Sequence, residues 1–184
     1  MFTVILIGCG SGTKAPQSSD AVSYYLNSEA SPGTERAVQR AFDAWEASGL
    51  VKFHYAGRTK AGIRKDGKNT VSFLLTWPED IPFGHIAYTA LWYDKQGRII
   101  EADIICNMRI GNFTTYETLK PDACFVEEVL AHEIGHLLGL GHSEDPCSIM
   151  HPLFQADADP RPVLVGPDSF IVLEKLIGDS FILK

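Results

Sequence analysis

The chain has few cysteines, no cluster of basic residues and no long apolar run. Its 184 residues include four cysteines, too few for a disulfide-stapled scaffold and without a CxxC pair. Lys and Arg number 16 against 23 Asp and Glu, and no Lys/Arg-rich run occurs, so we expect no nucleic-acid partner. No apolar run reaches the roughly 20 residues of a membrane helix. No internal period indicates a repeat array.

What remains is the composition of one globular domain. Hydrophobic residues make up 45% of the chain, too many for a disordered protein. A length of 184 residues suits a single hydrophobic core. We divide the chain into an N-terminal segment, residues 1–20, and one folded domain, residues 21–184, and we expect a monomer.

The N-terminal segment is apolar up to Cys9 and then turns small and polar. The glycines at residues 8–12 suggest a phosphate-binding loop, but such a loop needs a helix directly after it, and residues 16–19 show no helical period. An apolar core that ends in small residues is typical of an export signal. Residues 6–9, Leu-Ile-Gly-Cys, resemble the lipobox of bacterial lipoproteins, although no Lys or Arg precedes the apolar run. The resemblance implies lipidation at Cys9, with the protein exported and either lipid-anchored to the membrane at the cell envelope or secreted.

The folded domain alternates strand and helix signals. Ser31 followed by Pro32 is typical of a helix start, and apolar residues at i, i+3, i+4 and i+7 from Val38 form one helix face that ends before Gly49. Two further helices are predicted over residues 122–138 and 168–177. Strands are predicted over residues 21–26, 51–55, 70–76, 85–93 and 98–107. This order indicates one α/β domain with a mixed sheet.

The most informative segment is an HExxHxxGxxH pattern at the end of the second predicted helix. His132 and His136 are one helical turn apart, so both imidazoles face one point. Gly139 can adopt a positive φ, end the helix and let the chain deliver His142 as a third ligand. Three imidazoles bind Zn²⁺ and leave a fourth position for water, whose pKa falls toward about 7. Glu133 stands beside the first ligand, where it can take a proton from that water.

The simpler interpretation is that these histidines share an accidental spacing. With this composition the five fixed positions arise by chance about 3 × 10⁻⁵ times per chain, so a metal site is the stronger hypothesis.

The motif resembles that of the metzincin zinc endopeptidases, and Ser143 after the third histidine resembles their matrixin branch. Met150, eight residues after His142, is similar to the family's Met-turn methionine, although core packing alone would also explain it. His151 stands where the family usually has tyrosine. The resemblance implies a metzincin-like α/β (α+β) catalytic domain: a twisted, mixed five-stranded sheet, two long helices, a Met-turn and a C-terminal helix.

The resemblance also implies a function. We expect an exported zinc endopeptidase with one catalytic Zn²⁺ and Glu133 as general base. A protein or peptide substrate would lie antiparallel to the edge strand at residues 85–93, beside a pocket walled by residues 153–165. The alternatives are a non-catalytic, zinc-stabilised binding module on the cell surface and a metal-dependent hydrolase of other substrates.

Other candidate ligands are weak. His54 and His85 have no suitably spaced acidic partner, so we expect them to be structural or exposed. Residues 94–97 suggest a calcium loop but carry too few oxygen ligands to support one. Of the cysteines other than Cys9, Cys124 and Cys147 can form a bridge that braces the metal site, or all three can be free thiols.

Overall fold

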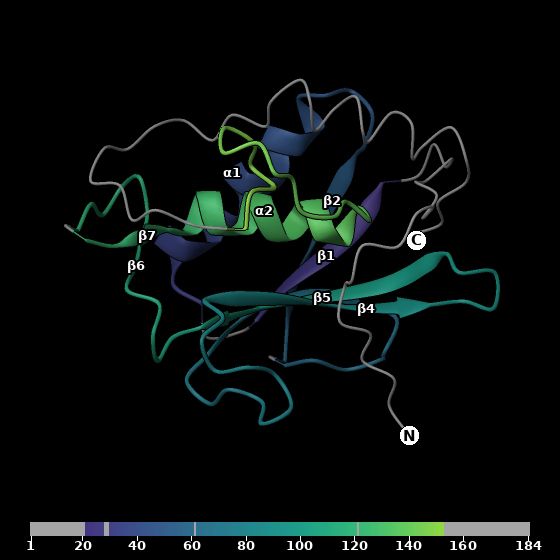
Figure 1. Cartoon of the computed structure of the whole chain (residues 1–184), viewed down its shortest axis with the longest axis horizontal. Helices are drawn as coiled ribbons and strands as arrows, with labels where there is room; N and C mark the ends of the chain where they lie inside the picture. Colours follow the sequence, from purple (N-terminus) through teal and green to yellow (C-terminus); the bar gives the residue numbers. More distant parts are fainter. Residues whose placement is uncertain (1–20, 28–29, 61, 121, 153–184) are drawn as a thin grey trace.

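The fold is a five-stranded sheet with two helices on one of its faces (Figure 1). It is seen in a computed structural model that describes residues 21–27, 30–60, 62–120 and 122–152. The main elements are β1 (Val22–Asn27), α1 (Pro32–Glu46), β2 (Phe53–Thr59), β3 (Asn69–Leu74), β4 (Ala87–Tyr93), β5 (Ile99–Asn107) and α2 (Val126–Leu137). Within those residues, neither helix is long and apolar enough to cross a membrane.

The sheet has the strand order β2-β1-β3-β5-β4. All neighbours are parallel except β4, which runs antiparallel to β5. Parallel neighbours need a crossover, which α1 supplies between β1 and β2. The predicted mixed five-stranded sheet with two long helices is therefore confirmed. Because β4 is an edge strand, one of its sides is not paired within this sheet.

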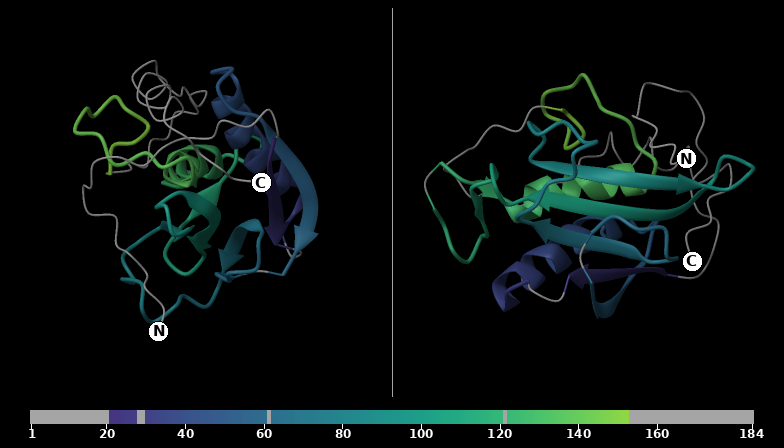
Figure 2. Two further views of the ribbon diagram at one scale, coloured as in Figure 1. Left: turned by 90° about the vertical axis from the view of Figure 1, so that its right-hand side faces the viewer. Right: turned by 90° about the horizontal axis from the view of Figure 1, so that it is seen from below.

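The first helix begins as its sequence predicts. The Ser31 hydroxyl accepts a hydrogen bond from the Thr34 amide at 3.1 Å, and Pro32 opens the helix. The predicted apolar face is buried between the sheet and α2. At its end the Trp45 indole N–H donates to the Ala131 carbonyl oxygen at 2.8 Å and so joins α1 to α2. The left view of Figure 2 looks along α2 and shows the sheet curving beside it.

The second helix is shorter than predicted. It begins at Val126 rather than residue 122, because β7 (Cys124–Phe125) pairs with β6 (Phe113–Thr114) in a separate two-stranded sheet. Phe125 is extended, with ψ 126°, and the Cys124 amide donates to the Asn112 carbonyl oxygen at 2.8 Å. This long-range pairing overrides the helical pattern of the sequence.

The second strand is longer than predicted. It continues to Thr59, beyond residue 55, through a bulge at which the partners of β1 shift from Tyr55 to Arg58. Gly57 has φ 99° there, a conformation that favours glycine. The sequence predicts a loop at this point because a bulge and a turn both use glycine.

Of the two alternatives for Cys124 and Cys147, a bridge or free thiols, the structure has free thiols at both residues, as it has at Cys106. Cys124 is half-buried directly before α2, whereas Cys147 is exposed in the loop that follows this helix. Three predicted features lie outside the described residues: the N-terminal segment with Cys9, the pocket wall at residues 153–165 and the helix at residues 168–177.

Candidate metal centre

Two histidines of α2 point their imidazoles at one place. The Nδ1–H of His132 donates to the Ile149 carbonyl oxygen, and that of His136 donates to the Leu140 carbonyl oxygen, each at 2.8 Å. A carbonyl only accepts, so Nδ1 carries the proton in both rings and Nε2 keeps its lone pair. The two Nε2 atoms lie 3.1 Å apart. This is the tautomer that a metal bound through Nε2 requires.

The third imidazole arrives through a sharp end to α2. Gly139 has φ 88°, and the Leu140 amide donates back to the Gly135 carbonyl oxygen at 2.9 Å. The chain then brings the exposed His142 ring to 5.2 Å from His132 and 4.9 Å from His136, centroid to centroid. One nitrogen from each of the three rings lies within 4.8 Å of the other two. Among the described residues, these histidines are the one group of three His, Cys, Asp or Glu side chains close enough together to hold a metal ion.

Burial keeps the histidine cluster neutral. It lowers the pKa of His132 to about 3 and that of His136 to about 4, and the charge on neighbouring imidazoles acts in the same direction. The pKa of the more exposed His142 is also lowered, chiefly because the surrounding protein removes part of the water around its ring, and the charges of His151 and His85 act in the same direction. Neutral imidazole is the form that binds Zn²⁺, so these residues fit the metal without first losing a proton at neutral pH.

A buried carboxylate lies beside the three imidazoles. Burial raises the pKa of Glu133 to about 7, while a hydrogen bond from Thr89 lowers it. The Thr89 hydroxyl lies 2.5 Å from Oε2 of Glu133. A cavity of about 600 Å³ opens in front of this group, lined by Pro82, Gly84, His85, Ile86, Ala87, Tyr88, Thr89, Val129, His132, Glu133, His136, His142 and Pro152. The cavity therefore runs along the first half of the edge strand β4 and the segment before it.

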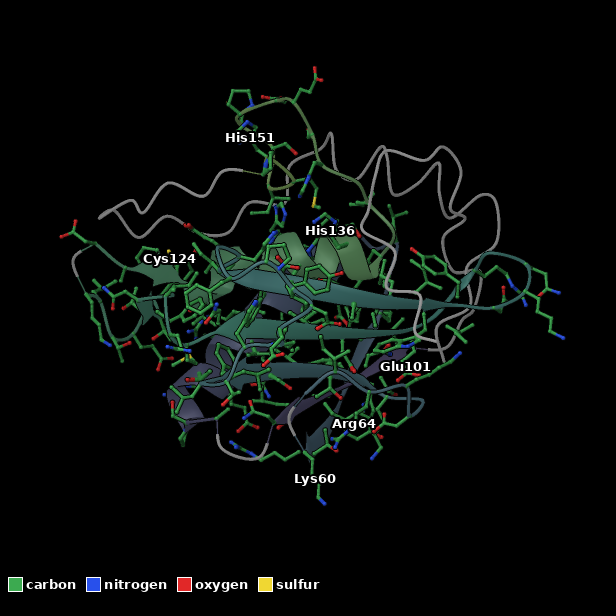
Figure 3. All side chains as sticks on the ribbon, turned by 60° about the horizontal axis from the view of Figure 1, so that its bottom comes forward. Lys60, Arg64, Glu101, Cys124, His136 and His151 are labelled. Carbon is green, nitrogen blue, oxygen red and sulfur yellow. The ribbon has the colours of Figure 1, made fainter. Side chains whose placement is uncertain are left out.

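Met150 packs against α2 at Gly135, close to the histidine cluster. Its side chain is almost completely buried, and a Cβ on Gly135 would come within 2.2 Å of its sulfur. The loop around it is tied back by the Ser143 amide, which donates to the Met150 carbonyl oxygen at 2.9 Å. Figure 3 shows His136 on α2 and, above it, the loop that carries the half-buried His151.

The other residues considered from the sequence lie outside the group of three histidines. His54 and His85 are both exposed, as expected, but His85 lines the mouth of the cavity and its charge lowers the pKa of His142. The Asp94 carboxylate accepts hydrogen bonds from the Arg98 side chain and from two backbone amides of its own turn. Sequence reasoning missed Thr89. Its signal is a threonine among the alanine, leucine and aromatic residues of the strand.

Comparison with known proteins identifies the family. A family model described as Matrixin matches residues 17–169. Similar proteins include matrix metalloproteinase-16 of Rattus norvegicus, 27% identical over 132 residues that cover 67% of this chain and 20% of the relative. Matrix metalloproteinase-20 of Homo sapiens is 28% identical over 139 residues, 73% of this chain and 26% of the relative. Matrilysin of Rattus norvegicus is 59% identical over 50 residues, 27% of this chain and 18% of the relative. The chain therefore spans between 18% and 26% of the length of these relatives. Because the family model covers most of its length, the chain belongs to the matrixin family.

Proposed function

We propose that this protein is a zinc-dependent endopeptidase. The observation that carries the proposal is the convergence of three neutral imidazoles beside a buried carboxylate, in a cavity bordered by an edge strand. The relatives named matrix metalloproteinases agree with this assignment. In the proposal His132, His136 and His142 bind one Zn²⁺ ion, and Met150 forms the apolar floor below them.

The donor set supports zinc. Nitrogen ligands of neutral histidine suit this ion, and three protein ligands are typical of catalytic rather than structural sites. The Ile149 and Leu140 carbonyl oxygens fix the ring orientation of the two buried histidines, as outer partners of a metal site do. Bound zinc supplies a Lewis acid that polarises the scissile carbonyl and acidifies water near neutral pH.

Glu133 is the proposed general base. Its carboxylate lines the cavity and lies directly after the first histidine of the cluster. A carboxyl group whose pKa is raised to about 7 can both accept and release a proton near neutral pH. In the proposal it takes a proton from the attacking water and returns it to the leaving amine.

The substrate class follows from β4. As an edge strand, β4 offers backbone N–H and C=O groups to an extended peptide, which binds by adding a strand to the sheet. The cavity beside it has apolar lining from Ile86, Ala87 and Val129, which would accept an apolar side chain of the substrate.

The location of the protein is a separate part of the proposal. We infer that it is exported and anchored to the membrane of the cell envelope through a lipid on Cys9, or secreted. Fractionation of cells that carry the wild type or Cys9→Ala tests this: the variant is expected to leave the membrane fraction. A wild type recovered only from the cytoplasm would contradict export.

The central test is a peptide-library digest by the purified, zinc-loaded protein, with and without chelator. We expect cleavage that the chelator abolishes and added zinc restores. Glu133→Ala should lose cleavage and keep stoichiometric zinc, whereas His136→Ala should lose both. Glu128→Ala is the matched control, because Glu128 lies on the same helix but does not line the cavity.

Each other outcome identifies a different alternative. Zinc binding without cleavage of any peptide would indicate the non-catalytic binding module. Full cleavage by Glu133→Ala would refute the general-base mechanism. Hydrolysis of non-peptide substrates alone would indicate a hydrolase of another class.

A further inference from the structure

One side chain of the edge strand contacts the proposed general base. The Thr89 hydroxyl, on β4, lies 2.5 Å from Oε2 of Glu133 and 3.2 Å from the main-chain carbonyl oxygen of the same residue. Thr89 is 5% exposed, and Glu133 is 44 residues away in sequence. Both acceptors therefore belong to one residue of α2, and the hydroxyl joins the strand to the helix at the metal centre.

The fold does not require a hydroxyl at this position. Valine has nearly the same shape as threonine and at least as strong a preference for strands. A buried hydroxyl is favourable only where it finds a partner, and here the partner is Glu133. The contact thus points to a task that involves the carboxylate.

We propose that Thr89 is a positioning residue that fixes the Glu133 carboxylate for proton transfer, an inference that rests on the proposed endopeptidase function. The hydroxyl donates its one proton to the nearer oxygen, Oε2. Among the described residues nothing donates a hydrogen bond to Oε1, and Glu133 lines the cavity. Oε1 is therefore the oxygen left to receive the proton of the attacking water, and Thr89 prevents the carboxylate from turning it away.

The position of Thr89 also connects the base to the substrate. The strand that holds the hydroxyl is the edge strand to which a peptide would add. In a sheet, side chains alternate between faces while the backbone carries the pairing groups. The backbone of β4 can bind the substrate while its Thr89 side chain holds Glu133. One rigid strand therefore fixes the positions of both the substrate and the general base.

The test compares two substitutions at one position. Thr89→Val removes the hydroxyl and keeps the shape, whereas Thr89→Ser keeps the hydroxyl. For zinc-loaded enzyme and one peptide substrate, we expect Thr89→Val to lower kcat by about 10- to 100-fold, with KM within about twofold of the wild type, since a hydrogen bond to a charged group is lost. Thr89→Ser should recover most of kcat. Zinc content and thermal midpoint are measured for each variant.

A matched control is Thr70→Val, which removes a buried hydroxyl from β3 in the same sheet, away from the cavity. It should leave kcat unchanged. In a Glu133→Gln background, Thr89→Val should lower the residual rate no further, because Thr89 acts through the carboxylate.

The two proposals fail separately. A wild type that cleaves no peptide refutes the endopeptidase function. An active wild type whose kcat per zinc-loaded molecule is unchanged by Thr89→Val refutes the role of Thr89. So does a Thr89→Ser variant that is as slow as Thr89→Val while equally folded and zinc-loaded.

Discussion

Replacing Gly135 by alanine tests how closely α2 packs against Met150 and Trp45. Gly135 lies in α2 between the two buried histidines of the cluster. A Cβ added there would lie 2.2 Å from the Met150 sulfur, 3.0 Å from its methyl carbon and 3.1 Å from Cζ2 of Trp45. Normal contact is about 3.5–4.0 Å, so the sulfur has to retreat by more than about 1 Å. Met150 is buried, and the Trp45 indole is held by its hydrogen bond to the Ala131 carbonyl oxygen.

Two opposing effects set the magnitude. Alanine in a helix interior is favoured over glycine by about 1 kcal/mol. Overpacking a close-packed core costs about 1–3 kcal/mol. We therefore expect Gly135→Ala to lower the free energy of unfolding by up to about 2 kcal/mol. Because Met150 follows Ile149, whose carbonyl oxygen orients His132, the shift should also weaken zinc affinity by about 10-fold.

The assay is urea denaturation followed by tryptophan fluorescence, in excess chelator so that metal binding does not contribute. Zinc affinity is measured separately by competition with a chromogenic chelator. Gly33→Ala in α1 is the matched control, because its Cβ would meet only the Ser31 hydroxyl, at 3.8 Å, and it should be neutral or stabilising. In a Met150→Ala background the cost of Gly135→Ala should disappear. A Gly135→Ala protein at least as stable as the wild type, with unchanged zinc affinity, would refute the reasoning.

Two further predictions concern buried carboxylates. Burial raises the pKa of Asp103 to about 7 from 3.8, so its protonated form stabilises the fold fully below pH 3.8, and that contribution is lost as the pH rises through about 7. Asp103→Asn should lower the free energy of unfolding, measured by urea denaturation, and this loss should become smaller between about pH 4 and 8, by at most about 4 kcal/mol. A loss that grows with pH would mean that the two backbone amides bonded to Asp103 outweigh the effect of burial. Arg40→Ala leaves the fully buried Glu127 carboxylate without the cation now 2.6 Å away, and should cost about 3 kcal/mol in the same assay. Arg36→Ala breaks an exposed pair with Glu117 and should change little, so equal losses from the two arginine variants would contradict this.

Local features were the ones that the sequence predicted correctly. Ser31 and Pro32 start α1 because a cap involves only the next three residues. The apolar periods locate five strands and two helices. The spacing of His132 and His136 brings them together because residues four apart on a helix share a face.

Features made by distant segments needed the tertiary structure. The sequence placed the start of α2 too early because it cannot show that β7 pairs with β6. It did not reveal the bulge in β2, since a glycine there also suits a turn. The pair of the half-buried Arg40 and the buried Glu127 joins two helices through residues 87 apart, and in the sequence each alone is an ordinary charge on a helix surface.

The candidate metal centre shows the same division between what the sequence and the tertiary structure determine. By itself the sequence determined its chemistry: three imidazoles and one carboxylate at a spacing fixed by a single helix and its glycine end. Only the tertiary structure decided which groups surround them, because those contacts depend on strand register and loop packing. Thr89 comes from β4 to hold Glu133, and the carbonyl oxygen of Ile149 returns from the following loop to orient His132. No periodicity encodes such contacts, since each depends on how separate elements pack in space.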